Sequence, residues 1–364
     1  MTRGRPAIAA WVPGWDNGGV ERMLVNLARG LDAHGLRMDL LVGPRASAYL
    51  DELPAATRVA RLAGDPREAL ATWARDQRPA WILASKPGDS MVLGAMPRSR
   101  LAGARLAIRV GTMLSTVLGR QGPLRRHRQR RAMARALAGA DRILAVSRGV
   151  AADAARLARM DPARIRVVPN PVLTPDLPDR AREAVEPPPG PGPLLVGVGR
   201  LARAKDFETL IRAFARFHRE RGGRLLILGE GRQRPRLEAL VRRLGVSTAV
   251  GLPGHDPNPY PLIRAADLFV LSSRWEGSPN ALIEALALGT PVVATDCASG
   301  PAEILQDGRA GALVPPADPP ALAAAMVEAL DHPPPTAVRA AAAAPYRLEP
   351  ATRAYMAALD LACT

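Results

Sequence analysis

Short, mostly apolar runs alternate with longer amphipathic stretches along the chain, and this rhythm limits the folds that it can adopt. Runs such as "AIAAWV" at 7–12 and "AWILAS" at 80–85 have the composition of strands buried on both faces. Strands of that kind occur in parallel sheets that helices cover on both sides. The pattern therefore predicts an α/β protein built from βαβ units.

The apolar runs fall into two series, which predicts two domains. The strand candidates are "AIAAWV", "MDLLVG", "RVARLA", "AWILAS", "ARLAIRV", "RILAVS" and "IRVVPN", then "LLVGVGR", "RLLILGE", "AVGLPG", "LFVLSS" and "PVVAT". Between the two series, nine prolines fall in residues 169–193, where they remove hydrogen-bond donors and favour extended backbone. We expect two tandem doubly wound, Rossmann-like domains at 1–170 and 194–345, with a Pro-rich linker at 171–193. A C-terminal helix at 346–364 is expected to pack back on the first domain.

Composition is that of a packed protein of the cytoplasm. Hydrophobic residues make up 48% of the 364 positions and charged residues 23%, and no apolar run reaches the roughly 18 residues of a membrane-spanning helix. The N-terminal "PAIAAWVPGW" is too short and too interrupted by proline for a signal sequence. The two cysteines, Cys297 and Cys363, cannot form a disulfide framework, which fits a reducing compartment.

The chain is strongly basic, with a formal charge of +16 and a pI near 11.3. Such a charge favours an anionic partner: nucleic acid, anionic lipid or a phosphorylated substrate. Of the 50 basic residues, only Lys86 and Lys205 are lysines. Because this arginine bias accompanies abundant alanine and proline, genome composition is an alternative explanation, and charge alone does not choose among the partners.

The stretch "EGSPNALIE" at 276–284 follows the strand candidate "LFVLSS". Ser278 followed by Pro279 predicts a helix N-cap with proline at the first helical position. The backbone N–H groups of Gly277, Ser278 and Asn280, together with the positive end of the helix dipole, then form an anion site at the carboxyl edge of the sheet. Phosphate is the anion that we expect there.

Two glutamates flank this predicted phosphate position. Glu284 lies about five residues into the helix, about 7 to 8 Å along the axis from Pro279, which is roughly the distance from a phosphate to its ribose. Glu276 precedes the helix, on the side where a group attached beyond the phosphates would lie. We therefore expect Glu284 to accept from ribose hydroxyls and Glu276 from sugar hydroxyls. The alternative is a plain loop carboxylate and a plain helix-surface residue.

The same stretch resembles the E-x7-E motif of retaining, family 4 glycosyltransferases with the GT-B fold, whose two Rossmann-like domains face a cleft. The resemblance covers nearly the whole chain and is strongest over 196–315. There "VGVGRLARAKDFETLIRAF" is similar to the strand, loop and helix in which an arginine and a lysine of the family hold the donor diphosphate. The matching positions are Arg200 and Lys205, to which the resemblance gives catalytic roles with Glu276. A lysine kept in so arginine-rich a chain supports that role for Lys205.

Two further segments resemble substrate-binding parts of the family. "GWDNGGVERMLVNLA" is similar to the glycine-rich loop that approaches the donor from across the cleft, where Gly18 and Gly19 let backbone come close to a ligand. A glycine pair also marks ordinary turns. In "GLPGHDPNPYPLI", we expect Gly254 and His255 beside the nucleobase, although His255 is equally compatible with a plain turn.

The chain departs from the family pattern on the acceptor side. Many relatives carry a histidine after the strand that corresponds to "ARLAIRV", whereas this chain has Gly111 there. Arg109, Thr112 and His127 are candidates to line the acceptor side instead, and each has a structural or solvated role as its alternative.

The resemblance implies an enzyme that moves a sugar from a nucleotide sugar, UDP-linked, to a glycan or lipid-linked acceptor of cell-surface polysaccharide or glycolipid synthesis. It implies front-face substitution in which the leaving phosphate assists deprotonation of the acceptor. No Asp-x-Asp motif and no His/Cys cluster with metal spacing occurs, so we expect neither metal nor cofactor beyond the donor. The alternatives are a nucleotide-sugar epimerase on the same fold and a non-catalytic basic binding scaffold.

The stretch "PLRRHRQRRAMARAL" concentrates arginines at the start of an amphipathic helix: Arg125, Arg126, Arg128, Arg130 and Arg131. One interpretation is a surface that meets a lipid-linked acceptor at an anionic membrane, on the inner face of the plasma membrane. The other is a solvated, arginine-rich face. Nucleic acid is not expected, because aromatic residues are only 4% of the chain and this stretch contains none.

Overall fold

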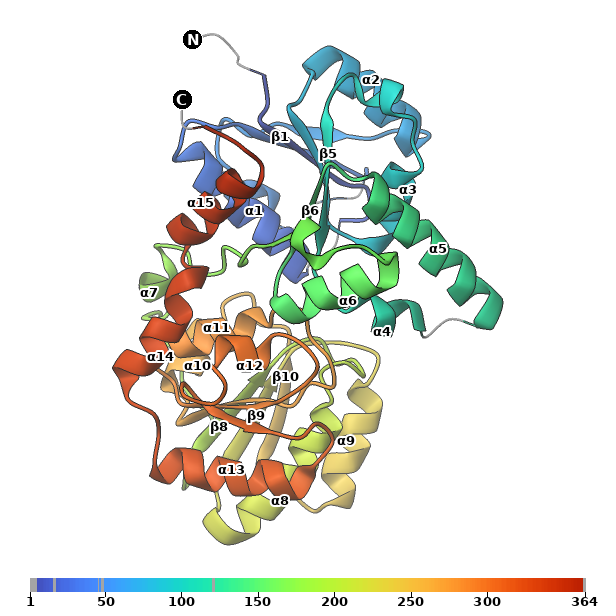
Figure 1. The fold of residues 1–364 in the computed structure, drawn as a ribbon. Helices are drawn as coiled ribbons and strands as arrows, with labels where there is room; N and C mark the ends of the chain where they lie inside the picture. Colours follow the sequence, from blue (N-terminus) through green and yellow to red (C-terminus); the bar gives the residue numbers. More distant parts are fainter. Residues whose placement is uncertain (1–4, 16–17, 45, 47–48, 120–121, 363–364) are drawn as a thin grey trace. The chain divides into compact units, whose positions relative to one another are not determined.

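The computed structural model describes residues 5–15, 18–44, 46, 49–119 and 122–362 (Figure 1). The chain forms two compact units. Unit 1 comprises Met1–Val172 and Arg347–Thr364, and unit 2 comprises Leu173–Tyr346. Among the described helices, none combines the length and the apolar character that crossing a bilayer requires.

Unit 1 contains, within its described residues, a seven-stranded parallel sheet in the order β3-β2-β1-β4-β5-β6-β7. All seven strand candidates of the first series form strands. Their bounds are β1 (Ile8–Val12), β2 (Met38–Val42), β3 (Val59–Arg61), β4 (Trp81–Ala84), β5 (Arg105–Val110), β6 (Arg142–Ala145) and β7 (Ile165–Val167).

Burial on both faces explains why these strands are apolar. In β1, Ile8, Ala10 and Val12 belong to one hydrophobic cluster, whereas Ala9 and Trp11 belong to another, because successive side chains point to opposite faces. Helices supply the other side of each cluster: α1 (Gly19–Asp32) and α15 (Leu348–Ala358) on one face, and α2 (Pro66–Gln77), α3 (Pro87–Gly94), α4 (Leu114–Gly119), α5 (Pro123–Gly139) and α6 (Arg148–Ala158) on the other.

Helix α15 comes from the C-terminal segment and completes one face of unit 1 beside α1 (Figure 1). Gly30 of α1 allows the close approach, since a Cβ there would lie 2.0 Å from the Oγ1 atom of Thr352. Beyond the helix, the carbonyl oxygen of Leu359 accepts a hydrogen bond from Trp81 Nε1 at 2.8 Å. The segment is therefore part of the core of unit 1.

A buried arginine joins β5 to this segment. Arg109 is only 3% exposed. Its Nε donates to the hydroxyl of Tyr355 at 2.9 Å, and its Nη2 donates to Asn170 Oδ1 at 2.6 Å. Burial raises the pKa of the Tyr355 hydroxyl, although the charge of Arg109 opposes that rise. Arg109 thus connects strand β5, helix α15 and the end of the first chain segment of unit 1.

Unit 2 contains, within its described residues, a six-stranded parallel sheet in the order β10-β9-β8-β11-β12-β13. Its strands are β8 (Leu194–Val198), β9 (Arg224–Leu228), β10 (Val250–Gly254), β11 (Leu268–Leu271), β12 (Val292–Thr295) and β13 (Ala312–Val314). The last of these was absent from the sequence prediction. The two parallel α/β sheets confirm the predicted fold class.

Helices cover both faces of this second sheet as well. Helices α8 (Phe207–Arg221), α9 (Arg234–Arg243) and α13 (Pro319–Asp331) share one hydrophobic cluster (Figure 1). The remaining helices are α7 (Leu177–Arg180), α10 (Tyr260–Ala265), α11 (Asn280–Ala287), α12 (Pro301–Ile304) and α14 (Thr336–Ala343). Of these, α10 and α14 both contact α11. The loop that follows β11 and leads into α11 contains Glu276.

The segment predicted as a linker is ordered in its first half. Residues 171–193 include α7, in which Leu177 is buried, and the following Ala181 is buried too. The carbonyl oxygen of Ala181 accepts from Arg264 Nη1 at 3.3 Å, and that of Arg180 accepts from Asn258 Nδ2 at 3.0 Å. Residues 182–187 are exposed. Packing in unit 2 therefore begins well before residue 194.

We predict that Gly30→Ala lowers the free energy of unfolding by about 1 to 3 kcal/mol, because the added methyl would overlap Thr352. Urea unfolding measures the loss. Adding Thr352→Ala removes the overlapping oxygen, so the double variant should be more stable than the sum of the single effects indicates. Gly139→Ala is the control, since a Cβ there meets no atom within 4 Å. Unchanged stability in Gly30→Ala would contradict the close packing of α15 on α1.

Candidate active site

Three glycines follow neighbouring strands of unit 2 and line the carboxyl edge of its sheet. Gly199 follows β8, Gly229 follows β9 and Gly254 ends β10. Gly229 has a φ of +147°, and a Cβ on it would lie 2.0 Å from the carbonyl oxygen of Gly199. Its N–H donates to the carbonyl oxygen of Gly254 at 2.6 Å. Only glycine permits this approach, so the edge presents mainly backbone groups.

Lys205 and Glu276 form an ion pair that joins the loop after β8 to the loop after β11. Lys205 Nζ lies 2.6 Å from Glu276 Oε1, and Ser273 Oγ donates to the same oxygen at 2.6 Å. The two charged side chains are 22% and 12% exposed, so water screens the pair less than it would on the open surface. An ammonium has three donors and a carboxylate has two oxygens, so each group keeps capacity for a ligand.

A second ion pair holds the same two loops together. Arg274 Nε lies 2.8 Å from Asp206 Oδ2, and the backbone N–H of Arg274 donates to the carbonyl oxygen of Ala204 at 2.7 Å. The carbonyl oxygen of Lys205 accepts from Ser272 Oγ at 2.8 Å. These contacts fix the backbone on both sides of the Lys205 side chain.

The loop after β12 packs against Gly277, the residue that follows Glu276. Ser299 Oγ donates to the carbonyl oxygen of Gly277 at 3.3 Å, and a Cβ on Gly300 would lie 2.9 Å from that oxygen. Cys297 is buried in this loop, and burial, with the negative charge of Glu276 as the next cause, raises the pKa of its thiol to about 12. Cys297 therefore stays protonated and serves as a small apolar residue.

The start of α11 differs from the prediction. The helix begins at Asn280, and Pro279 takes the N-cap position with ψ at 104°, outside the helical region. Ser278 is therefore not the N-cap, and its Oγ is buried without a hydrogen bond. The backbone N–H groups of Gly277 and Ser278 also make no hydrogen bond to the described part of the chain. These two N–H groups are therefore available for the anion site that the sequence predicts.

Glu284 is the fifth residue of α11, and Tyr260 Oη donates to its Oε1 at 3.4 Å. Arg200 is exposed at the end of β8, and within the described residues its guanidinium forms no ion pair. His255 is exposed directly after Gly254. The structure therefore places these predicted residues on the loops and the helix that follow β8, β10 and β11.

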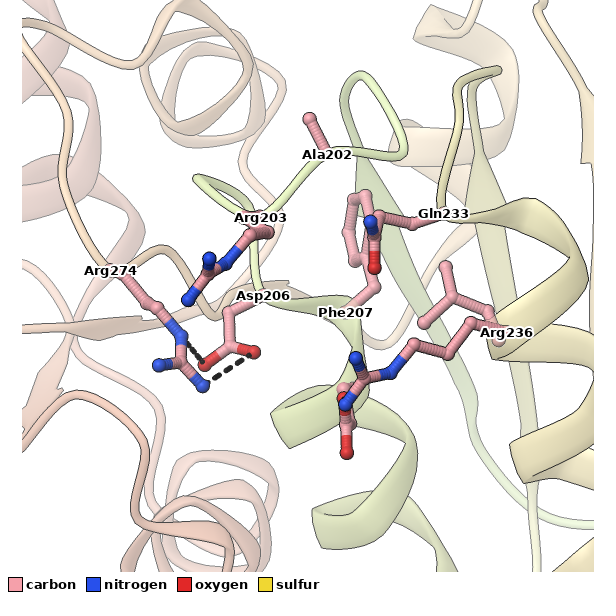
Figure 2. Close-up of a pocket in the computed structure, with 9 residues that line it drawn as sticks. Ala202, Arg203, Asp206, Phe207, Gln233, Arg236 and Arg274 are labelled. Atoms are coloured by element: carbon pink, nitrogen blue, oxygen red, sulfur yellow. Dashed lines mark hydrogen bonds and ion pairs between the residues drawn. The ribbon is translucent and has the colours of Figure 1, made fainter. Parts of the chain in front are cut away.

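A cavity of about 270 Å³ lies beside this cluster, between the N-terminal ends of α8 and α9 (Figure 2). Its lining consists of Ala202, Arg203, Asp206, Phe207, Glu208, Gln233, Arg236, Leu237 and Arg274. The ion pair of Arg274 with Asp206 forms one wall (Figure 2). The lining includes neither Lys205 nor Glu276 nor Glu284, so the cavity is not the predicted donor site.

Unit 1 carries a second charged cluster, which sequence reasoning missed. Lys86 Nζ lies 2.6 Å from Glu21 Oε1 and also donates to the carbonyl oxygen of Gly14. Glu21 is 1% exposed. Asp89 lies nearby, with its Oδ2 buried and without a hydrogen bond. Burial raises the pKa of Asp89 to about 6, although the positive charge of Lys86 opposes that rise; the negative charge of Glu21 adds to it by less.

The glycine pair lies at the start of α1, beside this cluster in the chain. Gly18 is the N-cap and Gly19 is the first helical residue. Gly18 has a φ of −117°, which any residue can adopt, so its backbone angles do not require glycine. Asp16 and Asn17 of the same predicted loop lie outside the described residues.

Of the acceptor-side candidates, Arg109 has a structural role. Gly111 lies against it, because a Cβ at 111 would come 2.7 Å from Arg109 Nη1. That guanidinium is held by Tyr355 and Asn170 and cannot easily move, so a histidine at 111 would need a rearranged core. Thr112 is half-buried after β5, and His127 is exposed on α5.

Comparison with known sequences identifies the family. The family described as "Glycosyltransferase Family 4" matches residues 17–175, and the one described as "Glycosyl transferases group 1" matches residues 192–332. The first match takes in most of unit 1, and the second takes in most of unit 2. The chain belongs to glycosyltransferase family 4.

Solved structures place this family 4 protein in the GT-B fold. HepE of Anabaena, solved in complex with UDP, superposes with a TM-score of 0.76 at 18% identity. The superposition covers 97% of this chain and 99% of that one. At this identity the likeness establishes the fold, and it agrees with the two parallel sheets described above.

Two curated relatives are similar over shorter stretches. One is the N-acetylgalactosamine-N,N'-diacetylbacillosaminyl-diphospho-undecaprenol 4-alpha-N-acetylgalactosaminyltransferase of Campylobacter jejuni, 35% identical over 175 residues, or 48% of this chain and 47% of that protein. The other is the lipopolysaccharide core biosynthesis glycosyltransferase LpsE of Rhizobium meliloti, 39% identical over 126 residues, or 35% of this chain and 36% of that protein. The chain spans less than half the length of each.

Sequence reasoning missed the residues that support the family 4 motif. The Arg274–Asp206 pair has no signal of its own, because arginines are common in this chain and the two partners are 68 positions apart. Ser273 is a serine at a strand end, and nothing in the sequence pairs it with Glu276. Lys86 did have a signal: it is the other lysine of a chain with 50 basic residues. Its rarity in so arginine-rich a chain distinguishes Lys86 as it does Lys205.

We predict that Asp89→Asn stabilises the protein at neutral pH. The folded pKa of Asp89, about 6, lies above the 3.8 of an unperturbed aspartate, so the carboxyl favours folding when protonated and opposes it as the pH rises through 6. The variant should gain about 1 to 3 kcal/mol at pH 8 and lose that gain near pH 4. Denaturant unfolding at both pH values measures it. Asp76→Asn, an exposed position on α2, should show no such pH dependence. An equal or lower stability of Asp89→Asn at pH 8 would contradict the burial of a carboxylate there.

Proposed function

We propose that the protein transfers a sugar, with retention of anomeric configuration, from a UDP sugar to a glycan or lipid-linked acceptor. The observation that carries the proposal is the Lys205–Glu276 pair beside the open N–H groups of Gly277 and Ser278. A cation and two N–H groups without a backbone acceptor suit a diphosphate, and a carboxylate next to them suits the hydroxyls of the attached sugar. The family membership supports the same assignment.

In this proposal, each predicted residue has one contact with the donor. Arg200 and Lys205 bind the diphosphate, and Glu284 accepts from the ribose hydroxyls. Gly254 and His255 lie beside the base, and Gly277, Ser278 and Asn280 hold phosphate oxygens. Gly18 and Gly19 keep their assignment to substrate binding. The Anabaena neighbour, whose structure was solved with UDP, supports UDP as the nucleotide.

The acceptor class rests on the relatives. The Campylobacter jejuni relative is named for a diphospho-undecaprenol acceptor, and the Rhizobium meliloti relative is named for lipopolysaccharide core synthesis. Both acceptors are glycans carried on lipids. We therefore assign this chain to cell-surface polysaccharide or glycolipid synthesis.

Front-face substitution accounts for the chemistry with these groups. The bond from the anomeric carbon to the diphosphate breaks with its electron pair on the phosphate oxygen, where Arg200 and Lys205 stabilise the charge. The acceptor oxygen bonds to the same face, and its proton passes to that phosphate oxygen. We propose that these cations act without a metal ion or a cofactor. The test is equal turnover with and without a chelator.

One assay distinguishes the proposed transferase from an epimerase and from a binding scaffold. The proposed transferase releases UDP and free sugar when water replaces the acceptor, an epimerase yields an isomeric nucleotide sugar, and a scaffold yields neither. Incubation with UDP-glucose, UDP-galactose and UDP-N-acetylglucosamine, followed by chromatography, separates the three.

We predict different effects for the two glutamates of the motif. Glu284→Gln should weaken UDP binding by about 1 to 3 kcal/mol, because it loses a charge-assisted hydrogen bond to ribose. Glu276→Gln should leave UDP affinity near normal, since Lys205 keeps its charge, while UDP-sugar turnover falls about 100-fold. Calorimetry and UDP release measure the two effects. Glu220→Gln, exposed on α8, is the matched control. Equal weakening of UDP binding by both variants would refute the assignment of Glu276 to the donor sugar.

The first half of α5 supports contact with an anionic membrane. Leu124 is 75% exposed at the start of the helix, and the five arginines at 125–131 are exposed as well. Within the described residues these arginines form no ion pair with a carboxylate. An apolar tip surrounded by unpaired cations suits an anionic lipid surface, where each cation contributes about 1 kcal/mol. We propose peripheral binding through this half-helix on the inner face of the plasma membrane.

We predict that reversing Arg125, Arg126, Arg128 and Arg130 to Glu abolishes flotation with vesicles that contain phosphatidylglycerol. The control reverses four exposed arginines of unit 2, namely Arg216, Arg232, Arg242 and Arg243, and so changes the net charge equally. If flotation depends on this half-helix, only the first variant loses it. Equal loss in both would make binding a matter of net charge, and no flotation of the wild type would remove the membrane proposal.

A further inference from the structure

The charged cluster of unit 1 lies where doubly wound sheets bind ligands. In the strand order β3-β2-β1-β4-β5-β6-β7, the chain leaves β1 toward β2 on one side and β4 toward β5 on the other. Such a switch point opens a crevice at the carboxyl ends of the two strands. Gly14 and Glu21 follow β1, whereas Lys86 and Asp89 follow β4. The cluster therefore contains residues from both sides of the switch point.

The lysine at this point is firmly held. Lys86 Nζ bonds to Glu21 Oε1 and to the carbonyl oxygen of Gly14, so it ties the first helix and the β1–α1 loop to the start of α3. Glu21 is almost completely buried, and a buried carboxylate requires such a partner. Lys86 and Glu21 thus form a rigid frame within unit 1.

Asp89 is the member of the cluster whose bonding is incomplete. Its Oδ2 is buried and makes no hydrogen bond to the residues that the structure describes, and the neighbouring Ser85, 2% exposed, has an Oγ in the same condition. Buried polar atoms without partners cost folding free energy, typically about 1 to 3 kcal/mol each. The raised pKa of Asp89 reports the same cost. Asp89 lies in the first turn of α3, where the helix dipole favours a negative charge, but its Oδ2 still lacks a hydrogen-bond donor, which a ligand hydroxyl would supply.

The charges of the cluster indicate the class of ligand. Lys86 contributes one positive charge, and Glu21 and Asp89 contribute two negative charges when ionised, which leaves the cluster at −1. With Asp89 protonated, the cluster is neutral. Neither state attracts phosphate. Both states suit a neutral hydroxyl, which donates to a carboxylate and accepts from a carboxylic acid.

We propose that Asp89, framed by Lys86 and Glu21, binds a hydroxyl group of the saccharide acceptor at the switch point of unit 1. This inference rests on the proposed function, because it assumes that the acceptor is a sugar. It names the polar group that stands on the acceptor side of a chain with glycine at position 111. Asp89 is a recognition residue in this account, and no proton transfer in the reaction is assigned to it.

The test measures saccharide binding without the donor. Saturation-transfer NMR at pH 7.5, with a panel of methyl hexosides, methyl hexosaminides and simple disaccharides, should detect at least one that binds the wild type. Asp89→Asn should weaken that sugar at least fivefold. Because this variant is expected to be more stable at this pH, unfolding would not explain the loss. Asp76→Asn should bind as the wild type does.

Two results would overturn the inference: no saccharide of the panel binds the wild type, or the sugar binds Asp89→Asn and the wild type equally. UDP binding and UDP-sugar hydrolysis by the wild type, measured in parallel, test the proposed function separately. Saccharide binding that depends on Asp89 in a protein that neither binds UDP nor cleaves UDP sugars would sustain the site and refute the transferase.

Discussion

Burial of parallel strands on both faces is the constraint on which the rest of this molecule depends. When helices cover both sides of a sheet, the strands have no surface on which to carry polar chemistry. Most charged groups then lie in the loops at the strand ends, and a charge within a strand, such as Arg109 of β5, needs buried partners. In unit 2, the Lys205–Glu276 and Arg274–Asp206 pairs join two such loops. In unit 1, Lys86 and Glu21 do the same at the ends of β1 and β4.

The fold was largely readable from the sequence because the same burial makes the strands apolar. Every strand candidate from 7–12 to 291–295 formed a strand. The missed strand, Ala312–Val314, has three residues at the edge of its sheet, and two of them are only half-buried. Its apolar run, "ALV", stops after three residues at Pro315, whereas the equally short edge strands β3 and β7 lie in longer strand-like runs.

The candidate site was predictable where its residues are close in sequence and obscure where they are not. The nine residues from Glu276 to Glu284 form one local unit, so their pattern predicted that a helix begins between the two glutamates, as the structure shows. One local prediction was wrong. Pro279 has an extended ψ, so the helix begins at Asn280 and Pro279, instead of Ser278, is the N-cap. The partners of Lys205 and of Lys86 are 71 and 65 positions away, and only the topology brings them together.

The composition of unit 1 from two chain segments has a consequence for its biogenesis. Residues 347–364 are synthesised after all of unit 2, yet Tyr355 and Leu359 lie in the core of unit 1. Until they arrive, Arg109 lacks the Tyr355 hydroxyl and the apolar face of α1 lacks its cover. Unit 2 can therefore finish folding on the ribosome before unit 1, although unit 1 begins first. During that interval, the apolar face of α1 is exposed, and exposed apolar surface of this kind is what chaperones bind.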